Sequence, residues 1–218
     1  MTKPFLAAFA VAGAVACATV PAQAAVTLKV NSTTIADNGA GDLDPALGQI
    51  NNTSFPVGFA GPHGFAINIG TTSSTPSIDL ASVDVTSTAA ATVVVMFTET
   101  DLSGPANWLT QFTGSWTGGS ASVRLQTYLD PGNTPFGTGL SLGDLTAAGT
   151  PFAVSTTAAS GFGGLFSVTE VLTITAGAAG EHFSLDGQLS DAPEPASIAL
   201  LGVGLTGLAW LRRRNARA

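Results

Sequence analysis

The sequence predicts an all-β fold, an antiparallel β-sandwich, for residues 25–191. Three observations support this prediction. Short segments alternate apolar and polar residues with period two, as strands with one buried face do. Clusters of Gly, Pro, Asn, Asp and Ser separate them and supply turns. No stretch of this region combines helical periodicity with helix caps. Strands and turns at this spacing favour a jelly-roll or immunoglobulin-like pair of sheets.

Each expected strand has its own pattern. The strands are expected at 26–30, 78–80 continuing at 83–85, 92–99, 123–129, 168–174 and 183–185. An unbroken apolar run from Val93 to Phe97 predicts a strand buried on both faces. In 123–129 the apolar residues share one face, and the polar residues Arg124, Gln126 and Tyr128 share the other.

Three aromatic residues, Trp108, Phe112 and Trp116, recur at a spacing of four in a segment expected to be part loop and part strand. Exposed rings of this kind stack on sugars. Buried rings fill a core, and each removes 150–250 Å² of surface from water. The core interpretation is favoured, and a lectin-like sugar site is the alternative.

Charge restricts the partners of the domain. Residues 25–191 contain two basic residues, Lys29 and Arg124, and thirteen acidic ones, for a net charge of −11, compared with −7 for the whole 218-residue chain. Such a surface repels nucleic acid and anionic headgroups, so we expect no nucleic-acid partner. The single cysteine, Cys17, lies outside this region, which therefore has no disulfide, thiol nucleophile or cysteine metal site.

Residues 1–24 have the features of a signal peptide. Lys3 precedes an apolar stretch over 5–18, and Ala22 and Ala24 supply the small residues that signal peptidase reads. Cleavage after Ala24 is expected. A lipobox ending at Cys17 is the alternative, but the preceding residues lack its usual leucine.

Residues 192–218 form a second targeting segment. Pro193, Glu194 and Pro195 precede an apolar stretch over 196–211 and a basic tail over 212–218. As a helix, the 16 apolar-segment residues would span about 24 Å, somewhat less than a bilayer core. By the positive-inside rule, Arg212, Arg213 and Arg214 stay cytoplasmic, so the domain lies outside. The two prolines keep the motif extended and accessible.

The segment PEPASIALLGVGLTGLAWLRRR, residues 193–214, resembles the PEP-CTERM sorting signal of exported bacterial proteins. The resemblance implies processing by an exosortase near Pro193, Glu194 and Pro195. It also implies a host that makes exopolysaccharide and a role in the extracellular matrix or biofilm. A plain C-terminal membrane anchor is the alternative.

Candidate metal ligands are few. Asp37, Asp42 and Asp44 offer carboxylates within eight residues, and Ca²⁺ binds such oxygens, but the spacing fits no EF-hand loop. A solvated turn is the favoured interpretation. We expect no cofactor, with calcium as the weaker alternative.

Glu170 falls in the apolar row of its strand, with Val168, Leu172 and Ile174. The functional interpretation is a general acid with a raised pKa. The favoured interpretation is a glutamate at a strand edge or one paired with Arg124. The two histidines, His63 and His182, support neither a catalytic triad nor a zinc site, because no companion motif accompanies them.

Together these features predict a non-enzymatic secreted or cell-surface protein. Its expected partners are signal peptidase, an exosortase, the inner membrane transiently, and extracellular polysaccharide. A lectin-like binding module is the first alternative. An extracellular glycoside hydrolase, which needs two carboxylates flanking a cleft, is the second.

Overall fold

The computed structural model describes residues 25–52, 65–74, 77–104, 107–192 and Leu205. The expected signal peptide with Ala22 and Ala24, the motif at 193–195 and the basic tail lie outside the described residues, as does His63. Of the expected membrane helix, only Leu205 is described. Among the described residues, no helix has the length and hydropathy needed to cross a bilayer.

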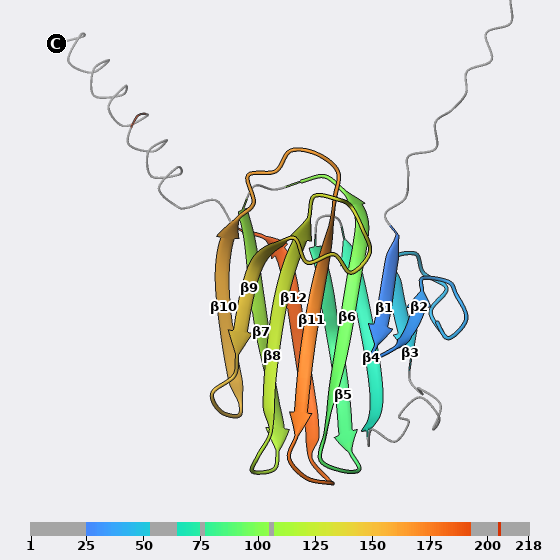
Figure 1. Cartoon of the computed structure of the whole chain (residues 1–218), viewed down its shortest axis with the longest axis vertical. Helices are drawn as coiled ribbons and strands as arrows, with labels where there is room; N and C mark the ends of the chain where they lie inside the picture. The colour runs from blue at the N-terminus through green and yellow to red at the C-terminus, as the bar shows by residue number, and fades with distance from the viewer. Residues whose placement is uncertain (1–24, 53–64, 75–76, 105–106, 193–204, 206–218) are drawn as a thin grey trace, which may run out of the picture.

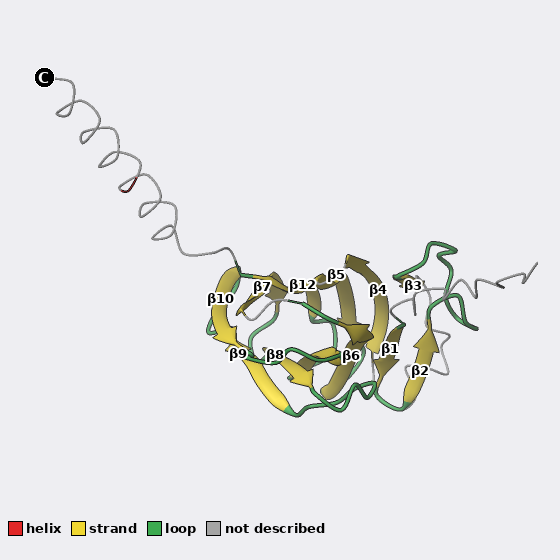
Figure 2. Cartoon of the chain, turned by 90° about the horizontal axis from the view of Figure 1, so that it is seen from above, coloured by secondary structure: helices red, strands yellow, loops and turns green. Residues whose placement is uncertain are grey.

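The described residues form twelve strands in two six-stranded antiparallel sheets, which Figure 2 shows as two layers. The front sheet, nearer the viewer in Figure 1, has the order β2 (Thr33–Ala36), β1 (Val26–Val30), β6 (Ala91–Leu102), β11 (Phe166–Ala176), β8 (Ser122–Asp130) and β9 (Leu140–Thr146). The back sheet has the order β10 (Phe152–Ala159), β7 (Asn107–Thr117), β12 (His182–Asp191), β5 (Ser77–Ser87), β4 (Phe65–Ser74) and β3 (Gln49–Asn52). The predicted all-β antiparallel sandwich is confirmed.

The connectivity of β5 to β12 is that of a jelly roll. Four of these strands lie together in the back sheet in the order β10-β7-β12-β5, and the other four lie together in the front sheet in the order β6-β11-β8-β9. From β5 to β12, the chain passes to the other sheet at every connection except the one between β8 and β9. Each sheet buries one face, and the strands of the other sheet cover that face. Of the four N-terminal strands, β1 and β2 extend the front sheet beyond β6, and β3 and β4 extend the back sheet beyond β5.

The core lies between the sheets and is built by period-two alternation. Val93, Val95 and Phe97 are fully buried, whereas Val94 and Met96 between them are partly exposed. The prediction that this strand is buried on both faces is therefore wrong for Val94 and Met96, although Thr98 in the same outer row is buried. A run of β-branched and large apolar residues does not distinguish a two-sided from a one-sided strand.

A long loop, residues 131–139, covers one end of the front sheet between β8 and β9. Asn133 anchors it: its Oδ1 accepts from the Asp101 amide at 2.8 Å, and its Nδ2 donates to Asp101 Oδ1 at 2.7 Å. The Phe136 amide donates to Thr98 Oγ1 at 3.2 Å. This cover buries Thr98 and Thr169 on a face that is otherwise open to solvent.

Trp108→Ala is expected to lower the free energy of unfolding by about 3–5 kcal/mol, because it leaves a cavity where a fully buried ring packs in the core. The ring is fully buried and lies edge-on to Phe166, with centroids 5.8 Å apart. Trp108→Phe should cost less, since the buried indole Nε1 has no hydrogen-bond partner within the described part of the chain. Urea unfolding followed by far-UV circular dichroism measures both. A wild-type midpoint for Trp108→Ala would contradict this packing.

Candidate binding face and buried carboxylates

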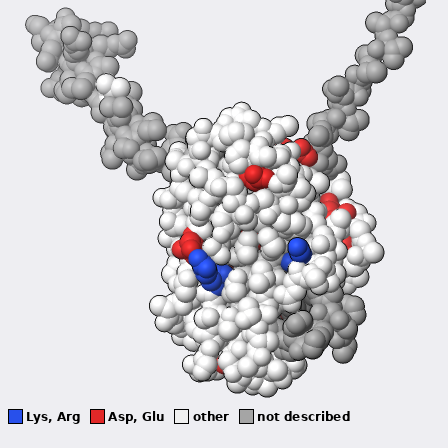
Figure 3. Space-filling model, in the orientation of Figure 1, with Lys and Arg blue, Asp and Glu red and all other residues white. Residues whose placement is uncertain are grey.

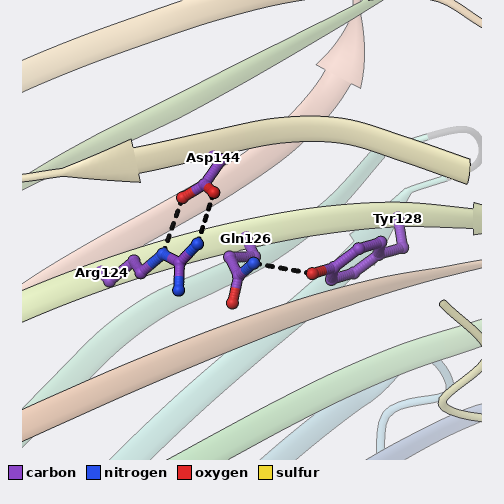
Figure 4. Close-up of polar contacts among 4 residues, drawn as sticks. All are labelled: Arg124, Gln126, Tyr128 and Asp144. Carbon is purple, nitrogen blue, oxygen red and sulfur yellow. Dashed lines mark hydrogen bonds and ion pairs between the residues drawn. The ribbon is translucent and has the colours of Figure 1, made fainter.

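The outer face of β8 and β9 carries a fixed group of polar side chains, shown in Figure 4. Alternation points the leucines of β8 into the core and turns Arg124, Gln126 and Tyr128 outward. Arg124 Nε and Nη2 donate to Asp144 Oδ1 and Oδ2 at 2.7 and 2.5 Å. Gln126 Nε2 donates to Tyr128 Oη at 2.7 Å. The hydrogen bonds and charge of Arg124 hold the pKa of the Asp144 carboxyl below its usual value.

Strand register extends this group into a row across the front sheet. Lys29, Met96, Val171, Gln126 and Asp144 are successive cross-strand partners on β1, β6, β11, β8 and β9. We call these five residues the front strip. Asp144 is exposed and the other four are partly exposed, so the strip presents apolar surface at its centre and polar groups towards both ends.

The 131–139 loop borders the front strip on one side. The row beside the strip contains Thr98, Thr169 and Tyr128, and the loop covers the two threonines. Lys29 Nζ lies 5.6 Å from the centroid of the Phe136 ring, a cation–π distance. The loop thus brings an aromatic ring to the side of the strip where Tyr128 also stands.

Charge is sparse on this face. Figure 3 shows two basic patches on it, which are Lys29 and Arg124, the two basic residues among those described. Arg124 is neutralised by Asp144. The front strip with Arg124 therefore carries one net positive charge in a domain that is strongly acidic overall.

Glu170 lies in the core, inside the sandwich. It is on β11, a central strand between β6 and β8, and its side chain is 0% exposed. Neither carboxyl oxygen has a hydrogen-bond partner among the described residues. The expectation that Glu170 stands at a strand edge or pairs with Arg124 is wrong. β11 is not an edge strand, and Arg124 points to the opposite face of the sheet, where it binds Asp144.

A β-bulge of the back sheet lies near the Glu170 carboxyl group. β5 has one residue more than either neighbouring strand between Asp79 and Val83. Burial raises the pKa of Glu170 well above its usual value, and the charges of Asp79 and Asp186 raise it further. The backbone amide of Leu80, which lies near the carboxyl group without completing a hydrogen bond, partly offsets the rise. Burial and then Asp186 raise the pKa of Asp79 to about 6. Burial also raises the pKa of Asp186.

These three carboxyl groups do not make a metal centre. No group of three or more His, Cys, Asp or Glu side chains suited to a metal ion occurs in the part of the chain that is described. Glu170 cannot reach solvent, so a substrate on the surface cannot contact it. Because ionising a buried carboxyl group disfavours the folded state, the raised pKa values make the stability of the fold depend on pH.

The acidic loop after β2 uses its carboxylates to fix its own backbone. Asp42 accepts amides from Asn38 at 2.8 Å, Asp44 at 2.9 Å and Asn51 at 3.1 Å. Asp37 Oδ2 accepts the Gly48 amide at 2.9 Å, and Asp44 Oδ1 accepts the Ala46 amide at 2.9 Å. The structure thus gives Asp37, Asp42 and Asp44 separate turn-forming roles and does not bring them together.

The aromatic residues and the described histidine have structural surroundings. Trp108 and Phe112 are fully buried, so the core interpretation is confirmed for both. Trp116 is partly exposed and packs beside Phe152, with ring centroids 5.7 Å apart. All three lie on the single strand β7, not on a loop and a strand as expected. His182 is exposed and its Nδ1 lies 2.9 Å from Thr86 Oγ1.

The C-terminal segment belongs to a class of protein-sorting signals. Residues 191–214 match the model of the PEP-CTERM protein-sorting motif. The chain is therefore a PEP-CTERM motif-containing protein, as the resemblance predicted. The motif indicates an exported protein that is processed at the membrane, and it implies an exosortase as the processing partner.

Comparison with solved structures gives distant similarities to the sandwich. One is the structure of TmCBM61 in complex with β-1,4-galactotriose, with 10% identity and a TM-score of 0.34, covering 64% of this chain and 95% of that one. Another is the enzymatically active domain of tailspike protein 4 of bacteriophage CBA120, with 6% identity and a TM-score of 0.30, covering 76% of this chain and 19% of that one. Neither assigns an activity. A search of curated proteins found no match.

Proposed function

We propose that this protein is a non-enzymatic component of an extracellular polysaccharide matrix or biofilm, delivered by signal peptidase and an exosortase. The proposal rests on the positions at which the sandwich begins and ends. β1 begins at Val26, two residues after the expected cut at Ala24, and β12 ends at Asp191, where the sorting motif begins. Both cuts therefore leave all twelve described strands intact.

In this proposal the tail is a temporary tether. The apolar segment 196–211 holds the exported precursor in the inner membrane, with Arg212, Arg213 and Arg214 on the cytoplasmic side. An exosortase cuts near Pro193, Glu194 and Pro195. The freed domain then reaches the cell surface or the surrounding matrix.

The surface of the domain is suited to a hydroxyl-rich partner. Its outward rows are rich in Ser, Thr and Gln, for example Gln111, Thr113 and Ser115 on β7. Hydroxyl and amide groups donate and accept hydrogen bonds without carrying charge. A net charge of −11 opposes association with anionic polymers.

A catalytic role has less support. A hydrolase of the two-carboxylate type needs both groups beside the substrate. Glu170, whose pKa is raised well above its usual value, is fully buried and out of reach of a substrate on the surface. The lectin-like alternative is favoured by one feature, the front strip, whose polar groups are held in place by hydrogen bonds to neighbouring side chains.

We likewise propose that the protein needs no cofactor. Equal melting temperatures with calcium and with a chelator would support this proposal.

Binding to the exopolysaccharide of the host tests the proposed function. Purified residues 25–192 should co-sediment with polysaccharide isolated from the native host and should remain bound when other proteins have been removed by protease. Recovery of the whole domain in the supernatant would argue against a matrix role. A catalysed decrease in the size of the polysaccharide would instead favour the hydrolase alternative.

A further inference from the structure

We infer that the front strip is the binding site for a neutral polysaccharide chain, which lies across the strands from β1 to β9. The inference rests on the proposed function and deepens it by naming the surface and the class of ligand. The strip runs through Lys29, Met96, Val171, Gln126 and Asp144, which strand register places side by side.

The dimensions of the strip suit an extended polymer. Five neighbouring strands spaced about 4.8 Å apart give a strip about 19 Å long, room for about four hexose units. The 131–139 loop borders one side, where Phe136 and Tyr128 stand. A chain lying along the strip would meet one side chain of each strand in turn.

The chemistry of the strip matches a sugar, which has both apolar C–H surfaces and hydroxyl groups. Met96 and Val171, partly exposed at the centre, offer apolar contact. Gln126 is held by Tyr128 Oη at 2.7 Å, and Asp144 by the Arg124 fork. Because these polar groups are already ordered, less conformational entropy is lost when a ligand binds.

The charge of the front strip and of the whole domain favours a neutral polysaccharide over an anionic one. Arg124 is neutralised by Asp144, so Lys29 supplies the only unbalanced charge among the strip and Arg124. One ammonium group does not offset the repulsion between an anionic polymer and a domain of net charge −11. Binding should therefore depend little on salt, since few counterions are released.

Affinity gel electrophoresis of residues 25–192 tests the site, with galactan, dextran and hydroxyethyl cellulose as neutral probes and alginate as the anionic probe. At least one neutral probe should retard the domain, with less than about a twofold change in affinity between about 0.05 M and 0.5 M NaCl. Val171→Glu and Gln126→Ala should each weaken that binding by about tenfold or more. Thr113→Glu, on the exposed face of β7, is the matched control and should bind as the wild type does.

The outcomes distinguish failure of the proposed binding site from failure of the proposed function. If Val171→Glu folds normally, by circular dichroism and melting temperature, and binds both the probe and the host polysaccharide like the wild type, the strip is not the site and the matrix role stands. Preference for alginate that disappears in salt would overturn the neutral-ligand inference alone. If the wild type binds neither the probes nor the host polysaccharide, both the strip and the proposed function fail.

Discussion

Glu170→Gln should stabilise the domain over the wild type, and the difference should grow as the pH rises from about 4 towards neutral. Glu170 is fully buried and its carboxyl oxygens have no hydrogen-bond partner among the described residues. Burial raises the pKa of Glu170 well above its usual value, so the folded protein keeps this proton while the unfolded chain loses it. A glutamine of the same shape has no proton to lose.

The direction of the pH effect follows from proton counting. Below the ordinary glutamate pKa, both the folded and unfolded states hold the proton, and ionisation of Glu170 costs nothing. Above it, the folded state holds more protons than the unfolded state, so the free energy of unfolding falls as pH rises. The slope is about 1.4 kcal/mol per pH unit for one group, until the pH passes the folded-state pKa. Urea unfolding at several pH values measures this slope.

Asp79→Asn provides a companion measurement. Because the pKa of Asp79 is raised to about 6, its share of the pH dependence should be confined to the range between its ordinary value and about pH 6. Asp79→Asn should flatten only that range, whereas Glu170→Gln should also reduce the slope above it. Parallel stability curves for the wild type and Glu170→Gln from pH 4 to pH 8 would mean that Glu170 is solvated.

Replacing Pro193, Glu194 and Pro195 with alanine should leave the exported precursor in the inner membrane with its tail uncut. Alanines favour helix, so the apolar segment 196–211 would extend through the motif, and the extended substrate for cleavage would be lost. Deleting residues 193–218 should have the opposite effect and release the domain without a membrane stage. Cell fractionation with immunoblotting of both variants in the native host distinguishes the two effects.

Ser197→Ala is the matched control, since it changes one residue of the apolar segment and leaves the motif intact. It should be processed like the wild type. If the triple alanine variant were cut and released at the wild-type rate, Pro193, Glu194 and Pro195 would not be the recognition element. Retention of the deletion variant in the membrane would mean that another segment anchors the protein.

The sequence predicted the fold class because alternation in the central strands is strong, as in β1, β8 and β11. It missed β10, whose residues are mostly Ala, Ser and Thr, because these small side chains carry little periodic signal. It also missed β9, where Gly143 and Asp144 interrupt the alternation of the leucines. Short β2 and β3 were missed for a similar reason. Their pairing is fixed by neighbouring strands, and that information is not local.

The candidate site could be predicted only in part. The sequence placed Arg124, Gln126 and Tyr128 on one face of a strand, which the structure confirms. It could not bring Met96 and Val171 beside them, because register between distant strands creates that row. It identified Glu170 as unusual from its apolar row but assigned it the wrong surroundings, since strand order decides whether a strand lies at an edge.

Intact mass spectrometry of the protein purified from its native host tests the central claim most directly, since the account requires a sandwich freed from targeting segments at both ends. The account predicts a polypeptide that begins at Ala25, ends at or beside residues 193–195, and lacks the apolar segment 196–211 and the basic tail. A water-soluble cytosolic protein with the mass of the full chain, from Met1 to Ala218, would contradict it.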